Sequence, residues 1–235
     1  RAGDTSQRLP EPALRDEVGE LAHTLNGMLA SLERAQEAEH RFVGDASHEL
    51  RTPLTALRGN AAYLARHGPD EAVIQDIADG AERLSRMLDD LLALAREDAA
   101  APLQGEPVRL AGLAEDVVVE RDVWVLGERD ALRRAVDNLV ANAHKHGTGR
   151  VTVTVGGTSG EAFIAVQDEG PGPRDPEAIF ERFRRGADAR GEGSGLGLAI
   201  VKAIAERHGG RVEVAGSRFT LVVKELSSTA RRTAS

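Results

Sequence analysis

The sequence contains no cysteine, and only one tryptophan, one tyrosine and five phenylalanines occur among its 235 residues. The absence of cysteine excludes disulfides and thiolate metal sites. With so few aromatic residues, a core must be built from Leu, Val, Ile and Ala, because hydrophobic residues still make up 41 % of the chain. No apolar run approaches the ~20 residues of a membrane-spanning helix, and no signal peptide is apparent. The chain begins with Arg rather than Met, so we expect a fragment or processed form with one or two domains.

Clustered positive charge is also lacking. Lys and Arg number 30 against 38 Asp and Glu, which gives a formal net charge of −8. Binding to a nucleic-acid backbone requires concentrated positive charge. We therefore expect no nucleic acid as the main partner.

Apolar residues recur at alternating spacings of three and four in two segments of the first hundred residues. The first segment follows an irregular polar stretch, residues 1–12, and its register continues more weakly through 35–49. A Gly-Pro-Asp turn at 68–70 separates the two segments. This spacing predicts two helices that each carry a coiled-coil seam. The seam residues are Val18, Leu21, Leu25, Met28 and Leu32, then Ile74, Ile77, Ala81, Leu84, Leu88, Leu91 and Ala95.

Two such helices joined by a short turn form a hairpin with a narrow core. We favour the pairing of two hairpins into a dimeric four-helix bundle. The alternative is that a single hairpin packs on the C-terminal domain of the same chain.

The remainder of the chain, after a linker at 96–107, alternates between helical and extended patterns. These patterns predict an α+β domain, an α/β sandwich with a mostly antiparallel sheet. The polar end, 227–235, is expected to be disordered. Helices are expected at 110–120, 128–146 and 196–208, and strands at 123–126, 150–155, 162–167, 211–214 and 219–223.

The stretch DNLVANAHKHG, residues 137–147, places Asn138 and Asn142 four residues apart on one helix face, with Lys145 nearby. Amide oxygens suit Mg²⁺, and a lysine suits a phosphate. In isolation, a solvated polar helix face is the simpler interpretation.

The stretch DEGPG, residues 168–172, directly follows an apolar strand. An Asp at a strand end can accept a hydrogen bond from an exocyclic amine, and glycines let a planar ligand approach the backbone. A tight turn would use the same residues.

The stretch GEGSGLGLAIVKAIAERHGG, residues 191–210, is a glycine-rich loop that opens into an amphipathic helix. Free N–H groups at a helix N-terminus bind phosphate. The loop is not a Walker loop and matches the Rossmann pattern poorly, so its meaning depends on the other two stretches.

Together the three stretches describe an ATP site, and their order resembles that of the sensor histidine kinases of bacterial two-component systems. They resemble the asparagine box and the two glycine boxes of that family's ATPase domain. FERFRRG, residues 180–186, resembles the phenylalanine box, and FVGDASHELRTPL, residues 42–54, resembles the phosphoacceptor box. DEVGELAHTLNGML, residues 16–29, resembles the second helix of a HAMP linker.

The resemblance implies that His48 is phosphorylated by ATP and that Glu49 acts as the general base on the other ring nitrogen. Thr52, four residues after His48, would orient a water for dephosphorylation of the partner. Pro53 offers no N–H to the carbonyl of Glu49, so we expect a bend just after the reactive turn.

The resemblance also assigns the nucleotide site. Asn142 is the expected Mg²⁺ ligand with Asn138 in support, Asp168 would accept the adenine amine, and His146 would stack on adenine. The phosphates would be contacted by Lys145 and by Arg182 or Arg185. Clearance would come from Gly170 and Gly172 for the base and from Gly193, Gly195 and Gly197 for the phosphates, with Leu196 in the same loop.

The implied protein is a Mg·ATP-dependent histidine kinase that forms a homodimer and passes phosphate to the receiver domain of a response regulator. It would be the cytoplasmic portion of a membrane protein with an upstream transmembrane sensor. Competing readings are a superfamily ATPase that works as a conformational clamp and a silent signalling scaffold. The expected division is 1–40 HAMP end and signalling helix, 41–98 dimerisation and phosphotransfer, 99–107 linker, 108–226 ATP binding and 227–235 tail.

Overall fold

The computed structural model describes residues 17–98, 103, 105–158, 160–176, 178–184 and 194–227. The segments expected to be irregular at the start and disordered at the end lie largely outside the described residues. The chain forms two compact units, 1–58 and 59–235. The boundary between them falls inside a helix, Glu17–His67.

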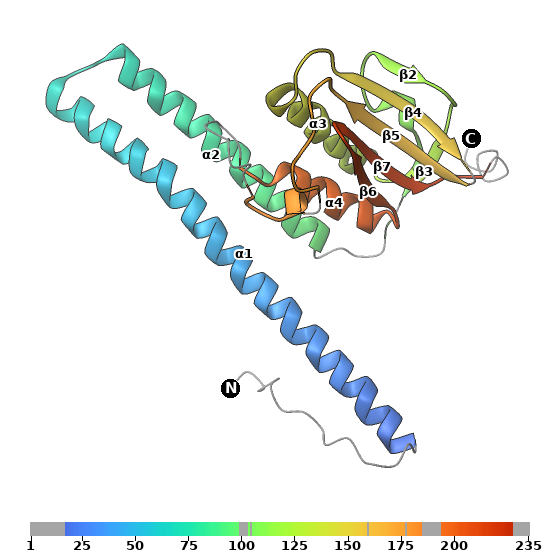
Figure 1. Ribbon diagram of the computed structural model, residues 1–235. Helices are drawn as coiled ribbons and strands as arrows, with labels where there is room; N and C mark the ends of the chain where they lie inside the picture. Colours follow the sequence, from blue (N-terminus) through green and yellow to red (C-terminus); the bar gives the residue numbers. More distant parts are fainter. Residues whose placement is uncertain are drawn as a thin grey trace. The chain divides into compact units, whose positions relative to one another are not determined.

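Helix α1 (Glu17–His67) and helix α2 (Glu71–Asp98) make up the N-terminal part of the chain (Figure 1). Gly68 ends α1 with φ +87°, a conformation that glycine adopts without steric cost. Asp70 begins α2 because its Oδ1 accepts hydrogen bonds from the backbone N–H groups of Ala72, at 3.0 Å, and Val73, at 3.3 Å. The predicted break at 68–70 is therefore confirmed.

Several seam residues of α1 are exposed in the single chain. Leu21 and Met28 are 61 % and 67 % exposed, and Leu25 and Leu32 are 41 % and 49 % exposed. Such a row of large exposed apolar side chains is typical of a surface that binds another protein segment. Among the described residues, no helix combines the length and the apolar character needed to cross a bilayer.

In the C-terminal part, the described residues form seven strands and two further α-helices around one core (Figure 1). Their bounds are β1 (Glu106–Arg109), β2 (Val117–Val119), β3 (Trp124–Gly127), α3 (Arg129–His146), β4 (Thr152–Thr158), β5 (Glu161–Gln167), α4 (Gly197–Arg207), β6 (Arg211–Ala215) and β7 (Arg218–Lys224). Short 3₁₀ turns, η1 and η2, occupy Leu110–Gly112 and Ala178–Phe180.

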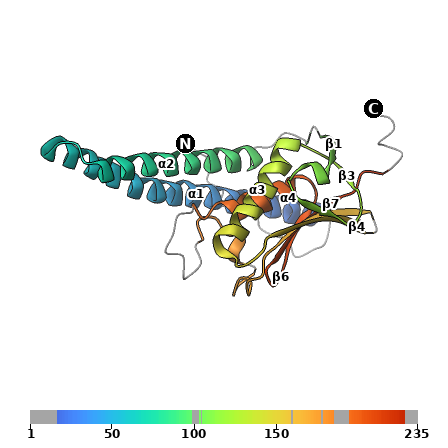
Figure 2. The same ribbon diagram turned by 90° about the horizontal axis from the view of Figure 1, so that it is seen from above.

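The main sheet has the strand order β2-β4-β5-β7-β6, and β1 pairs with β3 in a separate two-stranded ribbon. The pairs β4–β5, β5–β7 and β6–β7 are antiparallel, whereas β2 runs parallel to β4. Helices α3 and α4 lie side by side on one face of the sheet (Figures 1 and 2). Fully buried residues from both layers form the core: Leu132, Leu139, Ile164, Ile200, Ile204 and Leu221.

The expected helices at 128–146 and 196–208 and the largely antiparallel sheet are confirmed, but the helix expected at 110–120 is wrong. That segment forms the η1 turn and then strand β2. Asp116, with φ +52°, interrupts any helix, and the three valines that follow pair with β4. β-branched residues fit a pleated strand better than a helix, and here a distant partner strand was available.

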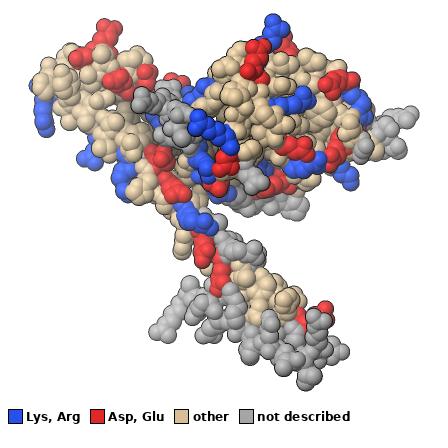
Figure 3. All heavy atoms as spheres, viewed as in Figure 1, with Lys and Arg blue, Asp and Glu red and all other residues tan. Residues whose placement is uncertain are grey.

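Strand β1 was not predicted, because it begins at Glu106 within the stretch read as a linker. Its pairing with β3 matches Val108 with Val125, both of which are buried. On the face seen in Figure 3, Lys and Arg side chains are interspersed with Asp and Glu over the α/β domain.

Candidate functional site

The segment around His48 lies within α1. The His48 side chain is exposed and Glu49 is half-buried. Thr52 follows one turn later, and its Oγ1 donates a long hydrogen bond of 3.5 Å to the carbonyl of His48. Pro53 lies inside the helix, so the carbonyl of Glu49 receives no N–H from the residue four positions on. An exposed imidazole can meet a reacting group that belongs to another domain or molecule.

Asp168 follows directly after β5 and is only 7 % exposed. Its Oδ1 accepts hydrogen bonds from the backbone N–H groups of Gly170, at 2.6 Å, and Thr148, at 3.4 Å. Its backbone carbonyl accepts a 2.6 Å hydrogen bond from Ser217 Oγ. The carboxylate is thus fixed in direction, and among the described residues no donor reaches its other oxygen. That oxygen can accept a hydrogen bond from an N–H or O–H group of a ligand.

Glycines are required where other chain segments approach closely. A Cβ on Gly170 would lie 2.6 Å from Asp168 Oδ1, and a Cβ on Gly147 would overlap the Asp168 side chain. Gly172 has φ +77°, and a Cβ there would collide with the carbonyl of Gly216. The turn after β5 therefore packs against both the end of α3 and the β6–β7 turn.

The asparagine face of α3 meets the start of α4. A Cβ on Gly197, the first residue of α4, would lie 3.0 Å from Asn138 Oδ1. Asn142 is partly exposed one turn further along α3. Leu196 is fully buried, and its carbonyl accepts the N–H of Ile200 at 2.9 Å, so it anchors the first turn of α4. Two stretches far apart in the sequence thus come together at a helix N-terminus.

The phenylalanine-box segment also reaches this loop. Gly195 has φ +66°, and a Cβ there would lie 2.8 Å from the backbone carbonyl carbon of Phe183. Arg182 is partly exposed in the turn beside it. Two of the predicted phosphate-loop and lid residues, Arg185 and Gly193, lie outside the described residues.

Lys145 and His146 project from the last turn of α3 and are exposed. The pKa of His146 is lowered below its ordinary value, mainly because its partial burial disfavours the cation, with a further contribution from the Lys145 charge. A neutral imidazole at neutral pH suits stacking on a purine better than a desolvated cation does.

Some groups that shape this site were not predicted from the sequence. Ser217 and Thr148 hold Asp168 from the β6–β7 turn and from the segment after α3. Ser194 hydrogen-bonds the backbone of Leu196. For Ser194 there was one signal in the sequence, its position inside the glycine-rich stretch. Nothing in the sequence pointed to Ser217 or Thr148.

A separate cleft of about 710 Å³ lies between α4, β6 and the η2 segment. Its lining includes Arg174, Phe180, Lys202, Glu206 and Val212. None of the predicted nucleotide residues lines it, so its volume gives no information on the site described above.

The donor set fits Mg²⁺ carried by a nucleotide. In the described part of the chain, no three His, Cys, Asp or Glu residues are grouped so that they could hold a metal ion. Mg²⁺ prefers oxygen ligands and keeps waters and substrate phosphates among them. Asn142 could supply one neutral oxygen, and the remaining ligands would have to come from phosphates and water.

Three family models match the chain. The model described as histidine kinase-, DNA gyrase B- and HSP90-like ATPase matches residues 127–227. The His Kinase A phosphoacceptor domain matches 38–100, and the HAMP domain matches 1–34. The chain belongs to the sensor histidine kinases of two-component systems.

Relatives of this histidine kinase support the same assignment. The probable sensor histidine kinase TcrY of Mycobacterium tuberculosis is 39 % identical over 89 % of this chain and 52 % of its own length. The histidine-protein kinase/phosphatase MprB of Mycolicibacterium smegmatis is 37 % identical over 91 % of this chain and 50 % of its own. The chain thus spans about half the length of the curated relatives it matches.

One solved structure has the same fold. The structure of full-length ShkA in complex with AMPPNP matches with a TM-score of 0.53 and 27 % identity. The match covers 80 % of this chain and 46 % of that one.

Proposed function

We propose that the chain is the kinase portion of a sensor that uses Mg·ATP to phosphorylate His48 and passes the phosphoryl group to an aspartate of a response regulator. The observation that carries the proposal is the approach of Asn138 to Gly197, because it joins the asparagine box to the second glycine box at a helix N-terminus. Family membership and the likeness to ShkA, whose structure was solved in complex with AMPPNP, support ATP as the nucleotide.

In this proposal the adenine end of ATP lies by Asp168. The fixed carboxylate accepts the exocyclic amine through its remaining oxygen, and His146 stacks on the ring. Gly170 and Gly172 serve the turn that holds this carboxylate, because a Cβ at either position would meet Asp168 or the Gly216 carbonyl rather than a ligand. The direction of the carboxylate selects a purine that carries an amine.

The phosphates lie at the start of α4, where backbone N–H groups and the helix dipole attract anions. Asn142 ligates Mg²⁺ with Asn138 beside it, and the ion would neutralise phosphate charge. We assign the phosphate contacts to Lys145 and to Arg182 or Arg185. Gly193, Gly195 and Gly197 would give clearance for the phosphates, with Leu196 in the same loop.

At the phosphoacceptor, an unprotonated ring nitrogen of His48 attacks the γ-phosphorus. The new N–P bond forms as the bond to the β–γ bridging oxygen breaks, and ADP leaves with that electron pair. Glu49 accepts or holds the proton on the other ring nitrogen, which stabilises the charge that develops on the imidazole. Catalysis then consists of positioning and charge neutralisation.

The phosphorylated histidine would donate to an aspartate carboxylate of a receiver domain. Thr52 lies on the same helix face as His48 and would orient a water for a separate phosphatase reaction, in which that water attacks the aspartyl phosphate of the receiver and inorganic phosphate leaves. Support comes from MprB, which is named a kinase/phosphatase.

The exposed seam of α1 supports assembly as a homodimer, since a second copy of this helix would cover Leu21, Leu25 and Met28. We assign residues 1–40 to the HAMP end, 41–98 to dimerisation and phosphotransfer and 108–226 to ATP binding. The match of a HAMP domain to residues 1–34 supports an upstream transmembrane sensor and a cytoplasmic position for this portion.

The test is incubation with Mg²⁺ and γ-labelled ATP, followed by measurement of acid-labile, alkali-stable phosphate. We expect label on the wild type, and none on His48→Gln or Asn142→Ala. His40→Gln, an exposed histidine two turns earlier on α1, is the matched control and should label normally. Nucleotide binding without label would refute the kinase proposal, and label on His48→Gln would refute the choice of residue.

A further inference from the structure

A side chain of α2 is hydrogen-bonded to the loop just before α4. We call residues 194–196 of this loop the phosphate loop, after the role proposed above. Ser194 lies two residues before Leu196, at the start of α4, and its Oγ accepts the Leu196 N–H at 3.2 Å. The same hydroxyl donates to Asp90 Oδ2 on α2 at 2.8 Å. A serine hydroxyl has one proton to donate. While Asp90 takes it, that proton is not available to a phosphate.

Asp90 carries an electrostatic cost in this position. Its pKa is raised, mainly because burial disfavours the carboxylate, and neighbouring Asp89 adds to that effect. The Ser194 hydrogen bond and the charges of Arg134 and Arg86 partly offset it. The carboxylate is therefore held by a small number of contacts at the edge of an anion-binding loop.

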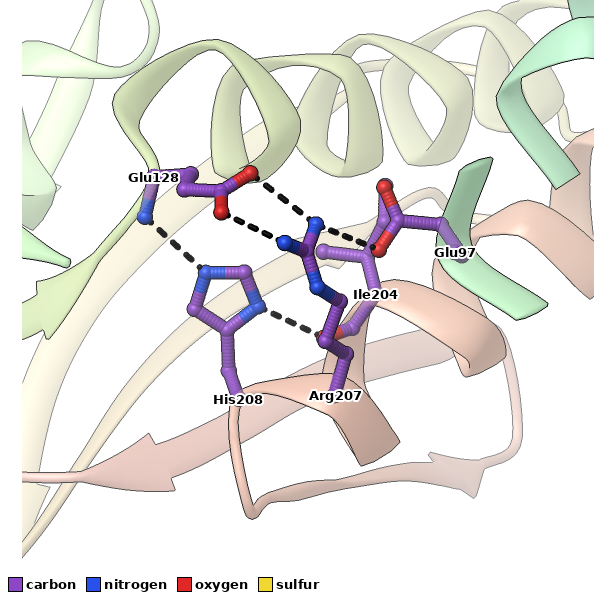
Figure 4. A network of polar contacts seen from close by, with 5 residues as sticks. All are labelled: Glu97, Glu128, Ile204, Arg207 and His208. Atoms are coloured by element: carbon purple, nitrogen blue, oxygen red, sulfur yellow. Dashed lines mark hydrogen bonds and ion pairs between the residues drawn. The ribbon is translucent and has the colours of Figure 1, made fainter. Parts of the chain in front are cut away.

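The C-terminal half of α2 packs against the same domain through one face. Met87 and Leu94 are 1 % exposed, and α2 contacts α4. Glu97, at the end of α2, forms a 3.2 Å ion pair with Arg207 of α4 (Figure 4). The Asp90–Ser194 hydrogen bond is thus part of an extended docking contact, and it is the part that reaches the phosphate loop.

We propose that Asp90 is a positioning residue that makes triphosphate binding and the docking of α2 on the ATPase domain mutually antagonistic. The inference rests on the proposed ATP site. A triphosphate at the start of α4 would compete with Asp90 for the Ser194 hydroxyl, and its charge would be repelled by the carboxylate. The two effects are reciprocal. The free energy by which docking weakens ATP binding equals the free energy by which bound ATP destabilises the docked state.

This coupling has a functional consequence for the proposed kinase. Binding of the triphosphate would weaken the docking of α2 on the ATPase domain through one charged group, Asp90. The nucleotide itself would therefore favour the undocked state of the domain. Adenosine, which lacks phosphates, would have no such effect, because it brings no phosphate that could compete with Asp90 for the Ser194 hydroxyl.

The first test compares the dissociation constants of Mg·AMPPNP and of adenosine for the full chain by calorimetry. Asp90→Asn keeps a hydrogen-bond acceptor but removes the charge, and should tighten AMPPNP binding about three- to tenfold with adenosine unchanged. Asp76→Asn is the control, since it makes the same charge change at an exposed site of α2, roughly 20 Å along the helix. Equal AMPPNP affinity in wild type and Asp90→Asn, or weaker binding by the variant, would overturn the coupling.

The second test reads docking without nucleotide. The absence of native cysteine allows spin labels at Glu82→Cys on α2 and Lys224→Cys on β7, both exposed. Asp90→Asn should broaden the distance distribution towards longer values in the absence of ligand, as Mg·AMPPNP should in the wild type. An unchanged distribution in Asp90→Asn would overturn the role in docking. Failure of the wild type to bind either ligand would refute the proposed ATP site, whereas normal binding with unchanged ratios refutes only the coupling.

Discussion

Replacement of Arg207 by methionine tests the polar network that joins α2, α3 and α4 (Figure 4). The Arg207 guanidinium donates to both carboxylate oxygens of Glu128, at 2.6 and 2.9 Å, and to Glu97 at 3.2 Å. The side chains of Arg207 and Glu97 are 16 % and 9 % exposed, so solvent screens the interaction only in part.

The expected loss can be estimated from these contacts. Charge-assisted hydrogen bonds contribute about 1.5–3 kcal/mol, and removal of one partner also leaves two carboxylates uncompensated. Among the described residues the buried Arg207 Nε finds no acceptor, which costs roughly 1–2 kcal/mol and offsets part of the gain. We therefore expect Arg207→Met to lower the free energy of unfolding by about 2 kcal/mol, and Tm by roughly 4–10 °C.

The assay is thermal and urea unfolding followed by tryptophan fluorescence, because Trp124 in β3 is the only tryptophan and reports on the α/β domain. Arg211→Met is the matched control. Arg211 also forms a bidentate pair, with Glu161, but both side chains are about half exposed at 52 % and 48 %, so its effect should be much smaller.

A second substitution separates two causes of the expected destabilisation: the loss of the Arg207 hydrogen bonds and the uncompensated charge left on Glu97. In Arg207→Met, further replacement of Glu97 by Gln should recover part of the loss, since one uncompensated carboxylate is removed. Equal shifts for Arg207→Met and Arg211→Met would refute the argument from burial. Greater destabilisation of the double variant would refute the argument from orphaned charge.

Three further predictions follow from other contacts. Gly172→Ala should destabilise the turn by at least about 1 kcal/mol, because φ is +77° and the new Cβ would meet the Gly216 carbonyl; a normal urea midpoint would contradict this. Leu25→Lys should raise the dimer dissociation constant by roughly tenfold or more, measured by analytical ultracentrifugation, and an unchanged constant would exclude this seam from the interface. The imidazole of His146 should titrate below ~6.5 by NMR, so it remains neutral at pH 7 and gains its proton only as pH falls further; Lys145→Met should raise the midpoint, and a midpoint above 6.5 would contradict the assigned cause.

Local signals accounted for the helical part of this protein and supplied the prediction of the site residues. The spacing of apolar residues predicted α1 and α2, and the Gly-Pro-Asp turn predicted where they separate. Helix periodicity and turn chemistry act over a few residues, so they can be recognised without knowledge of the fold. The glycine-rich stretch likewise predicted a loop followed by a helix, and α4 confirms the helix.

The same reasoning failed at 110–120, where the spacing of Leu110, Leu113 and Val117 imitates a helix. The run of valines became strand β2 because β4, more than thirty residues later, offered a parallel partner. Strand pairing is decided between segments distant in sequence, and local preference yields to it.

The site combines both levels. The sequence by itself predicts which residues bear the chemistry, such as His48, Asp168 and Asn138, because those residue types occur in short ordered motifs. Only the tertiary structure decided that Ser217 would orient Asp168 and that Asp90 would hold Ser194. These contacts join residues 49 and 104 positions apart, and a hydrogen bond depends on distances of a few tenths of an ångström that only the packed chain establishes.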